Sequence, residues 1–477
     1  MSSPFPFSLR LALAAALFSS TAFAQADYYV GDTLELPTFS SQDADHAVIA
    51  VNQYGDVVIA NHSSIGAHTK QVEVNVLAPL GATGAAGFKL FSPLLVGDPS
   101  LDILQFGTDS CAKPDIEALS DDSFLVVWSR HESAQRVPSR LEVCRIVTRD
   151  GNGALLAQPT YISPQPGEGF VIDSSSNAGQ AGFMPDIAAF GDSHPSMAYV
   201  VFAHETLNQV RPTNTYREYD IRCIKVDWMA TVQTPTIGNV LTLDTEIAMD
   251  NINTFPYSGG LVLPDAVIDD GDNLVVAYEE YLVEPHLGQL GSNKGSIKLQ
   301  RYSYSPFSLL NEVELSGYYA SRHQRRPMIA SSPADSENKI IIGWNETDND
   351  SSIIHRSHFK SITFNSNSAG FSSPVSLPWD ESFGIEDDLV TVAMSGLTEL
   401  LVSSRRFTNK FELTSSFKQT ASPDQLMNIS TRVNYPWRPA VSLFDFSSFS
   451  VCFTSFEGAA THNPNLYKIY LTIQKLQ

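Results

Sequence analysis

Histidines beside carboxylates recur at the ends of apolar segments, and this pairing is what general acid–base chemistry requires. His131 and Glu132 follow one such segment, His204 and Glu205 follow the next, and Glu279 follows a third. The pKa of a histidine lies near neutrality, so an imidazole can exchange a proton at physiological pH with help from a carboxylate. These five residues are the candidate catalytic groups if the protein is an enzyme. For any one of them, a solvated strand end is the simpler interpretation.

A second group consists of cations that stand directly before a proline. Lys113, Arg326 and Arg438 share this position. Clustered cations, and arginines above all, suit the binding of carboxylate or sulfate groups. The alternative is that they neutralise nearby carboxylates such as Asp115.

Three aromatic residues complete the candidate ligand-binding set. Tyr319, Trp379 and Trp437 fall in connections between repeated units, where their rings could stack on sugars. They could equally fill gaps between those units, which is the commoner role of aromatic side chains.

The elements that must position these groups form a repeat. An apolar segment led by proline is followed, after fourteen or seventeen residues, by an aromatic residue, with a short turn between. Self-similarity of this kind indicates a repeat architecture, and the repeated unit here is a β-hairpin. The pairs are Pro114 with Trp128, Pro185 with Phe202, Pro264 with Tyr278, Pro327 with Trp344, and Pro439 with Phe453.

Two further hairpins keep this rhythm without the proline, over residues 47–60 and 390–403. Third and fourth strands follow most hairpins, but the last unit ends after its third strand at 466–474. The segment 31–36 is similar to the outer strands at 238–243 and 311–315, so it is predicted to complete the last unit. The chain thus resembles the seven-bladed β-propellers of exported bacterial proteins. The predicted fold class is all-β: seven four-stranded antiparallel blades, closed by the N-terminal strand, with six or eight blades as alternatives.

Loop lengths point to one face of this ring. Turns between first and second strands are short, whereas connections between second and third strands, such as 203–219 and 279–295, are long. Connections between blades are long as well. In an up-and-down blade both long sets leave at the same face, and long loops on a rigid scaffold are where ligands usually bind.

Composition and the N-terminal residues suggest where the protein acts. Residues 1–24 have the single charge Arg10, an apolar stretch and the small-x-small pattern at 22–24, so we expect a signal peptide and export to the periplasm or the exterior. Residues 25–477 would then form a single propeller domain. No later apolar run reaches spanning length, so we expect no membrane insertion. The net charge of −22 disfavours nucleic acid as a partner, and we expect a monomer.

Cysteines and acidic turns are the remaining candidates for cross-links or metals. Four cysteines allow two disulfides in three pairings; Cys144 and Cys223 fall at similar places in successive units, and Cys452 is expected to be buried. No cofactor or metal is expected. The acidic stretches 269–272 and 348–351 lack the spacing of a calcium-binding loop, so calcium is weakly supported.

The sequence therefore predicts an exported propeller that binds a glycan or another protein on its long-loop face. The absence of a complete catalytic motif favours binding without chemistry. The alternative is a polysaccharide lyase or glycoside hydrolase that acts on an acidic glycan, with a cation to neutralise the substrate carboxylate and a histidine or a carboxylate pair for proton transfer.

Overall fold

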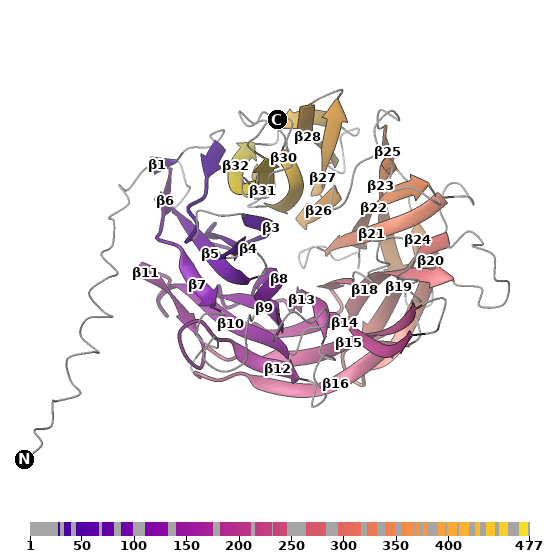
Figure 1. The fold of residues 1–477 in the computed structure, drawn as a ribbon, viewed down its shortest axis with the longest axis horizontal. Coiled ribbons are helices and arrows are strands. Elements are labelled where there is room, and N and C mark those ends of the chain that lie inside the picture. Colours follow the sequence, from indigo (N-terminus) through magenta and orange to yellow (C-terminus); the bar gives the residue numbers. More distant parts are fainter. Residues whose placement is uncertain are drawn as a thin grey trace, which may run out of the picture.

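A computed structural model of the chain shows antiparallel sheets arranged around a common centre (Figure 1). It describes residues between 27 and 475 with gaps, of which the longest are 99–109, 246–263, 283–293, 379–389 and 457–466. Figure 1 shows the first strand of several sheets, such as β3, β8 and β13, near the middle and strands such as β11 and β16 at the rim. The fold is a β-propeller.

The described strands form seven sheets, numbered by the order of their inner strands. The first sheet holds β1 (Asp27–Tyr28), β3 (Ala44–Val51), β4 (Val57–Ser64), β5 (Lys70–Pro79), β6 (Phe88–Leu90) and β7 (Leu94–Gly97). The second holds β8 (Ser110–Ala118), β9 (Phe124–His131), β10 (Arg140–Arg149), β11 (Leu155–Ile162) and β12 (Phe170–Ser174), and the third β13 (Phe183–Ala189), β14 (Met197–Val210), β15 (Thr215–Asp227) and β16 (Thr236–Asp244).

The fourth sheet holds β17 (Asp265–Ile268), β18 (Leu274–Leu282), β19 (Lys294–Ser303) and β20 (Ser308–Leu315). The fifth holds β21 (Arg322–Ser331), β22 (Lys339–Asp348), β23 (Ile354–Asn365), β24 (Ser368–Phe371) and β25 (Val375–Pro378), and the sixth β26 (Val390–Ser395), β27 (Thr398–Phe407), β28 (Lys410–Lys418) and β29 (Gln425–Ile429). The last holds β30 (Pro436–Leu443), β31 (Ser448–Phe456), β32 (Tyr467–Lys475) and β2 (Thr33–Glu35), which pairs with β32.

The predicted fold class needs a correction, because uniform four-stranded blades are not what the structure contains. The first sheet has six strands, and the second and fifth have five each. In the second sheet the extra strand β12 pairs with β10, the same strand that β11 pairs with. β7 shares β5 with β6 in the same way, and β25 shares β23 with β24. At the outer side of these sheets two strands therefore pair in succession with the third strand, and all of them except β11 have only three to five residues, which limits the edge that could pair with another chain.

Four of the five prolines of the repeat lie at β-bulges in the inner strands, and Pro264 lies directly before β17. The register of β8 on β9 shifts between Ala112 and Asp115, which places Pro114 in the bulge, and Pro185 lies in the equivalent shift of β13. Proline has no backbone N–H to donate, so a bulge at a sheet edge tolerates it. The preceding residue has positive φ in both strands, 53° at Lys113 and 50° at Met184, and His46 of β3 shares this conformation at 52°.

The aromatic residues of the repeat are buried between sheets. Trp128, Phe202, Tyr278 and Phe453 are fully buried and Trp344 is 6% exposed. Each packs in the apolar cluster that its sheet shares with the preceding one. Burial of one such ring stabilises a fold by several kcal/mol, and truncation to alanine costs about 3–5 kcal/mol.

The cysteines are free thiols in separate clusters. Cys144 lies between the first and second sheets, Cys223 between the third and fourth, and Cys452 between the last and first. These three therefore form no disulfide with one another, which overturns the similar-position argument for Cys144 and Cys223. Burial raises the pKa of all three thiols, so they behave as small apolar groups. The side chain of Cys111 lies outside the described residues. The part of the chain that the structure describes contains no helix that could cross a membrane.

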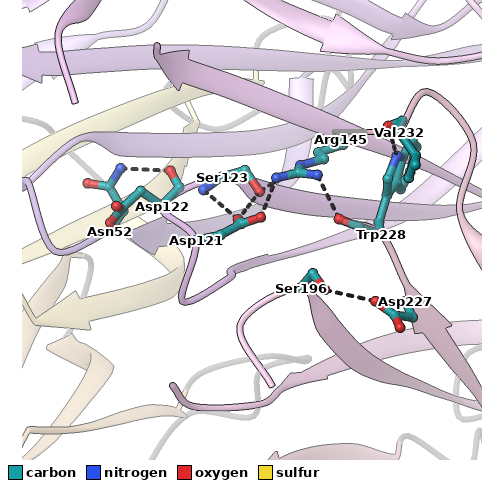
Figure 2. A network of polar contacts seen from close by, with 9 residues as sticks. All are labelled: Asn52, Asp121, Asp122, Ser123, Arg145, Ser196, Asp227, Trp228 and Val232. Carbon is teal, nitrogen blue, oxygen red and sulfur yellow. Dashed lines mark hydrogen bonds and ion pairs between the residues drawn. The ribbon is translucent and has the colours of Figure 1, made fainter. Parts of the chain in front are cut away.

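One network of polar contacts joins consecutive sheets at the end of the ring that carries the tight turns (Figure 2). Arg145 of β10 donates from Nε to Ser123 Oγ at 2.8 Å and from Nη1 to the backbone oxygen of Trp228, in the third sheet, at 2.6 Å. Its Nη2 forms an ion pair with Asp121. Asn52 of the first sheet donates to the backbone oxygen of Asp122 at 3.0 Å, so this network joins three sheets.

Arg145 supplies a test of this turn-end network. Arg145→Met removes three hydrogen bonds and leaves the partly buried Asp121 without its cation, so it should lower the free energy of unfolding by about 3 kcal/mol. Urea denaturation would measure this loss. Arg145→Met combined with Asp121→Asn should recover part of it, because the orphaned charge is gone. A single-variant loss below about 0.5 kcal/mol, typical of an ordinary surface change, would contradict the assigned role.

Candidate functional site

The long connections leave the ring at the end opposite the tight turns, which we call the loop end. Each second strand runs from a tight turn toward this end, and the third strand returns from it. In the third sheet β14 and β15 stay paired from Met197 opposite Asp227 out to Val210 opposite Thr215. This hairpin is the longest described pair, and it carries the third sheet furthest toward the loop end.

Two predicted histidines face the same seam between sheets. His131 ends β9 on the face that also carries Leu125 and Val127, because side chains alternate along a strand. His204 lies in β14 on the face of Val200 and Phe202. All four apolar residues belong to the cluster between the second and third sheets. Both histidines therefore lie at the loop end of this seam, and both are partly buried.

Glu279 is at a different seam. It follows Val275 and Ala277 along one face of β18, and those residues pack against the fifth sheet. The carboxylate is 2% exposed. The three successive sheets thus do not bring their predicted groups to one place, since the third and fourth sheets both lie between the seam of the two histidines and the seam of Glu279.

The other predicted residues are only partly within the described structure. Glu205 lies in β14, Arg326 in β21, and Trp437 and Arg438 in β30, without a described side chain. Glu132, Tyr319 and Trp379 lie outside the described residues. Their proposed roles remain predictions.

Lys113 takes part in a basic group that spans two sheets. Its Nζ lies 2.6 Å from Nε2 of His46, and the ring of His46 lies 4.7 Å, between centroids, from that of His62. Lys70 Nζ lies 3.0 Å from Nε2 of His62. We call His46, His62, Lys70 and Lys113 the basic seam. Sequence analysis missed three of its members, although His46 occupies in β3 the position that Lys113 occupies in β8.

An arginine–carboxylate cluster lies at the loop end of the same two sheets. Arg130 is fully buried and donates from Nη1 to both oxygens of Glu142, at 3.2 and 3.0 Å. Arg140 Nε is 3.1 Å from the same carboxylate, and Arg130 Nη2 donates to the backbone oxygen of Asp98 at 3.1 Å. Burial raises the pKa of Glu142, and the two arginines act in the opposite direction.

The aspartates that follow three of the prolines bridge neighbouring inner strands. Asp115 Oδ2 accepts a hydrogen bond from the backbone N–H of Ile187 in the next sheet at 2.8 Å. Asp186 accepts from Ala266 at 2.6 Å, in the same relation. Asp265 accepts from Ile329 at 2.8 Å. We call these contacts the three carboxyl bridges. They run in sequence from the second sheet to the fifth.

The same aspartates have pKa values far above the ordinary range. Burial raises the pKa of Asp115 and of Asp265 to about 7, against the effect of the backbone donors. Burial and the charge of Asp265 raise the pKa of Asp186, whose carboxyl hydrogen-bonds with that of Asp265. Desolvation of its carboxyl by the surrounding protein, together with the charge of Asp115, raises the pKa of Glu117 to about 8. Its side chain is exposed to solvent, so the pH argument below rests on the aspartates.

The carboxylate of Asp269, in the first acidic turn, already accepts hydrogen bonds from groups of the protein. Asp269 Oδ1 accepts from the backbone N–H groups of Gly271 and Asn273 at 2.9 and 3.0 Å, and Oδ2 accepts from Arg301 Nε at 2.6 Å. The stretch 349–351 lies outside the described residues. Among the residues that are described, no three His, Cys, Asp or Glu side chains gather as a metal site.

Comparison with solved structures finds a polysaccharide lyase, an endosialidase and a sialidase. The polysaccharide lyase Uly1 is 7% identical, over 96% of this chain and 94% of that one, with a TM-score of 0.49. The endosialidase of phage phi92 is 10% identical over 94% and 69%, with a TM-score of 0.47. A Trypanosoma rangeli sialidase in complex with the inhibitor DANA is 12% identical over 77% of this chain, with a TM-score of 0.44. This chain spans only 55% of the sialidase's length.

No family model and no curated protein matches the chain. At such low identities and TM-scores the structural matches transfer no activity, so we argue function from this chain's own residues.

The carboxyl bridges predict an unusual dependence of stability on pH. The folded state holds protons on these aspartates at pH values where an unfolded aspartate, with a pKa of 3.8, has lost them. Folding is therefore favoured by protons, and this contribution decreases as pH rises from about 4 to about 7. The melting temperature should fall by several degrees between pH 5 and pH 8, as calorimetry would show.

Replacing Asp115, Asp186 and Asp265 together by Asn should flatten this slope, because the amide oxygen still accepts the backbone hydrogen bond but does not titrate. Asp150→Asn, in an exposed turn where the side-chain oxygen caps backbone N–H groups, is the matched control and should keep the slope. A triple variant with the slope of the parent chain would show that the aspartates are ionised in the folded protein.

Proposed function

We propose that this chain is an exported propeller that binds a glycan at its loop end. The observation that carries the proposal is the difference between the two ends of the ring. The turn end is joined from sheet to sheet by polar contacts such as those of Arg145 with Trp228 and of Asn52 with Asp122. The loop end carries the long connections and the side chains of Lys113, His131 and His204.

This arrangement suits reversible binding of a polar ligand. Partly buried imidazole and ammonium groups hold hydrogen-bond donors and acceptors in fixed positions without closing them off from solvent. A rigid set of donors loses little conformational entropy on binding, which favours recognition of hydroxyl-rich or charged sugars. The aromatic residues predicted from the sequence, Tyr319, Trp379 and Trp437, would add stacking surfaces.

The location of binding can be tested directly. We expect a glycan array to give saturable binding, and the bound glycan to slow amide hydrogen exchange in peptides that contain the loop-end residues 129–131 and 204–206. Peptides from the tight turns at 52–56 and 119–123 should be unaffected. A protein partner without any glycan binding, or protection confined to the tight turns, would overturn the proposal.

A second candidate is a polysaccharide-cleaving enzyme, which the shared seam of His131 and His204 favours. One imidazole could remove a proton while the other returns it, as a lyase requires. Incubation with acidic polysaccharides would then give unsaturated products that absorb in the near ultraviolet, and His131→Gln or His204→Gln should reduce turnover by at least about a hundredfold. Reducing ends without ultraviolet absorption would indicate a hydrolase. Saturable binding with no product would dismiss both enzymes.

A further inference from the structure

The second strand of the first sheet carries an asparagine where the next three sheets carry an aromatic residue. In these four sheets a backbone hydrogen bond closes the tight turn, and the position can be counted from the residue that accepts it. In the first sheet the acceptor is Asp56, and five positions later comes Asn61. In the second, third and fourth sheets the acceptors are Ser123, Met197 and Asn273, and five positions later come Trp128, Phe202 and Tyr278.

Asn61 faces the last sheet, just as each of those aromatic residues faces the sheet before its own. It follows Ile59 along one face of β4, and Ile59 packs in the cluster that the first sheet shares with the last. Asn75 of β5 lies opposite Ile59 in the register, so its side chain is on the same face. The aromatic ring of this cluster, Phe88, belongs to β6, which pairs with the turn-end half of β5. The two asparagines, which we call the amide pair, therefore lie in the seam between the last and first sheets.

Both members of the amide pair are buried without a hydrogen-bond partner. Asn61 and Asn75 are 0% exposed, and within the described part of the chain neither the oxygen nor the nitrogen of either amide has a partner. Burial of an amide that makes no hydrogen bond costs free energy, whereas a buried aromatic ring stabilises the fold. The first sheet therefore gives up stability at this position in exchange for groups that can donate and accept. Asparagine is also smaller than an aromatic residue, so it fills less of the seam.

A short segment crosses this seam beside the amide pair. The backbone N–H of Leu36 donates to the oxygen of Ile469, in the last sheet, at 2.9 Å, and that of Phe39 donates to Glu73 Oε1, in the first sheet, at 3.1 Å. Glu73 lies opposite Asn61 in the register and on the same face. Residues 36–39, which we call the covering segment, therefore join the two sheets next to Asn61. The side chain of Phe39 is 49% exposed.

The amide pair suits an uncharged ligand rich in hydroxyl groups. A side-chain amide both donates and accepts hydrogen bonds, as a hydroxyl group does. A sugar ring has about the bulk of the aromatic ring that the equivalent position holds in the next three sheets. The exposed ring of Phe39 offers an apolar face to the same ligand.

We propose that the seam between the last and first sheets binds one uncharged sugar unit of the glycan, in the place that an aromatic ring takes in the following seams. The inference rests on the proposed function and names a subsite and its ligand class. Asn61 and Asn75 hydrogen-bond the hydroxyl groups of this unit. The covering segment moves aside to admit it, which breaks the hydrogen bond of Phe39 with Glu73.

The test uses the full chain with dextran, mannan and galactan as neutral probes and polygalacturonate as the acidic one. At least one neutral polymer should bind. Its affinity should be the same at low and high salt, because salt screens attraction between charges and not hydrogen bonds between uncharged groups.

Two double variants separate the amides from the space around them. Asn61→Ala combined with Asn75→Ala removes both amides and should weaken binding at least about tenfold. Asn61→Phe combined with Asn75→Ile gives the seam the residue types of Phe202 and Ile224 in the third sheet. This variant should abolish binding and melt at or above the temperature of the parent chain, because the unpartnered amides are gone. Asn152→Ala, in an exposed turn, is the matched control and should bind like the parent chain.

The outcomes distinguish the subsite from the proposed function. Binding of a neutral polymer by both double variants as tightly as by the parent chain would overturn the subsite and leave glycan binding elsewhere intact. If the Phe and Ile variant does not fold, the alanine pair decides by the same comparison. Binding confined to polygalacturonate would overturn the ligand class, and no binding of any glycan would overturn the proposed function itself.

Discussion

The constraint on which this structure depends is the exposed edge of every inner strand. A sheet that ends at the centre of a ring leaves backbone N–H groups pointing away from its own partner strand, and each such group must find an acceptor. At three consecutive junctions the acceptor is a carboxyl from the preceding sheet: Asp115 for Ile187, Asp186 for Ala266, and Asp265 for Ile329. A proline precedes each of these aspartates: Pro114 and Pro185 lie at β-bulges, and Pro264 lies directly before β17.

This arrangement separates structural and functional demands. The inner edge is held by the carboxyl bridges, and the turn end by contacts such as that of Arg145 with Asp121. The aromatic residues between sheets supply the apolar burial. The loop end has a buried ion pair of its own, Arg130 with Glu142, and also carries the remaining candidate functional side chains. The basic seam and the two histidines between the second and third sheets occupy that end, on neighbouring sides of the second sheet.

The sequence predicted a large share of the fold, because hairpins leave a local signal. The predicted outer strands at 238–243 and 311–315 lie within β16 and β20, and the predicted strand at 466–474 matches β32 within one residue. The short strands β7, β12 and β25 were missed, since four or five residues without regular alternation resemble a loop. Each of them pairs with a third strand that already has another outer partner, and this pairing depends on how the chain returns to the sheet, which a local sequence pattern does not reveal.

The candidate site was harder to predict for a related reason. Glu279 and His131 lie one and three positions after their aromatic residues, so each faces the sheet that follows its own. His204 lies two positions after Phe202 and faces the preceding sheet, which is why it shares a seam with His131 and not with Glu279. His46, His62 and Lys70 are far apart in sequence from Lys113, and only the packing of the first sheet on the second brings them together. The three Pro-Asp pairs were visible in the sequence, but their role depends on the edge of the next sheet.

Hydrogen exchange of single amides tests the carboxyl bridges most directly. In the parent chain the N–H groups of Ala266 and Ile329 should exchange slowly, because each donates to a partly or fully buried carboxyl. Asp186→Ala should speed the exchange of Ala266 by about tenfold or more and affect Ile329 much less. Unchanged exchange at Ala266 in a folded Asp186→Ala variant would contradict the central claim, because the inner edge would then be held by something other than the carboxyl bridges.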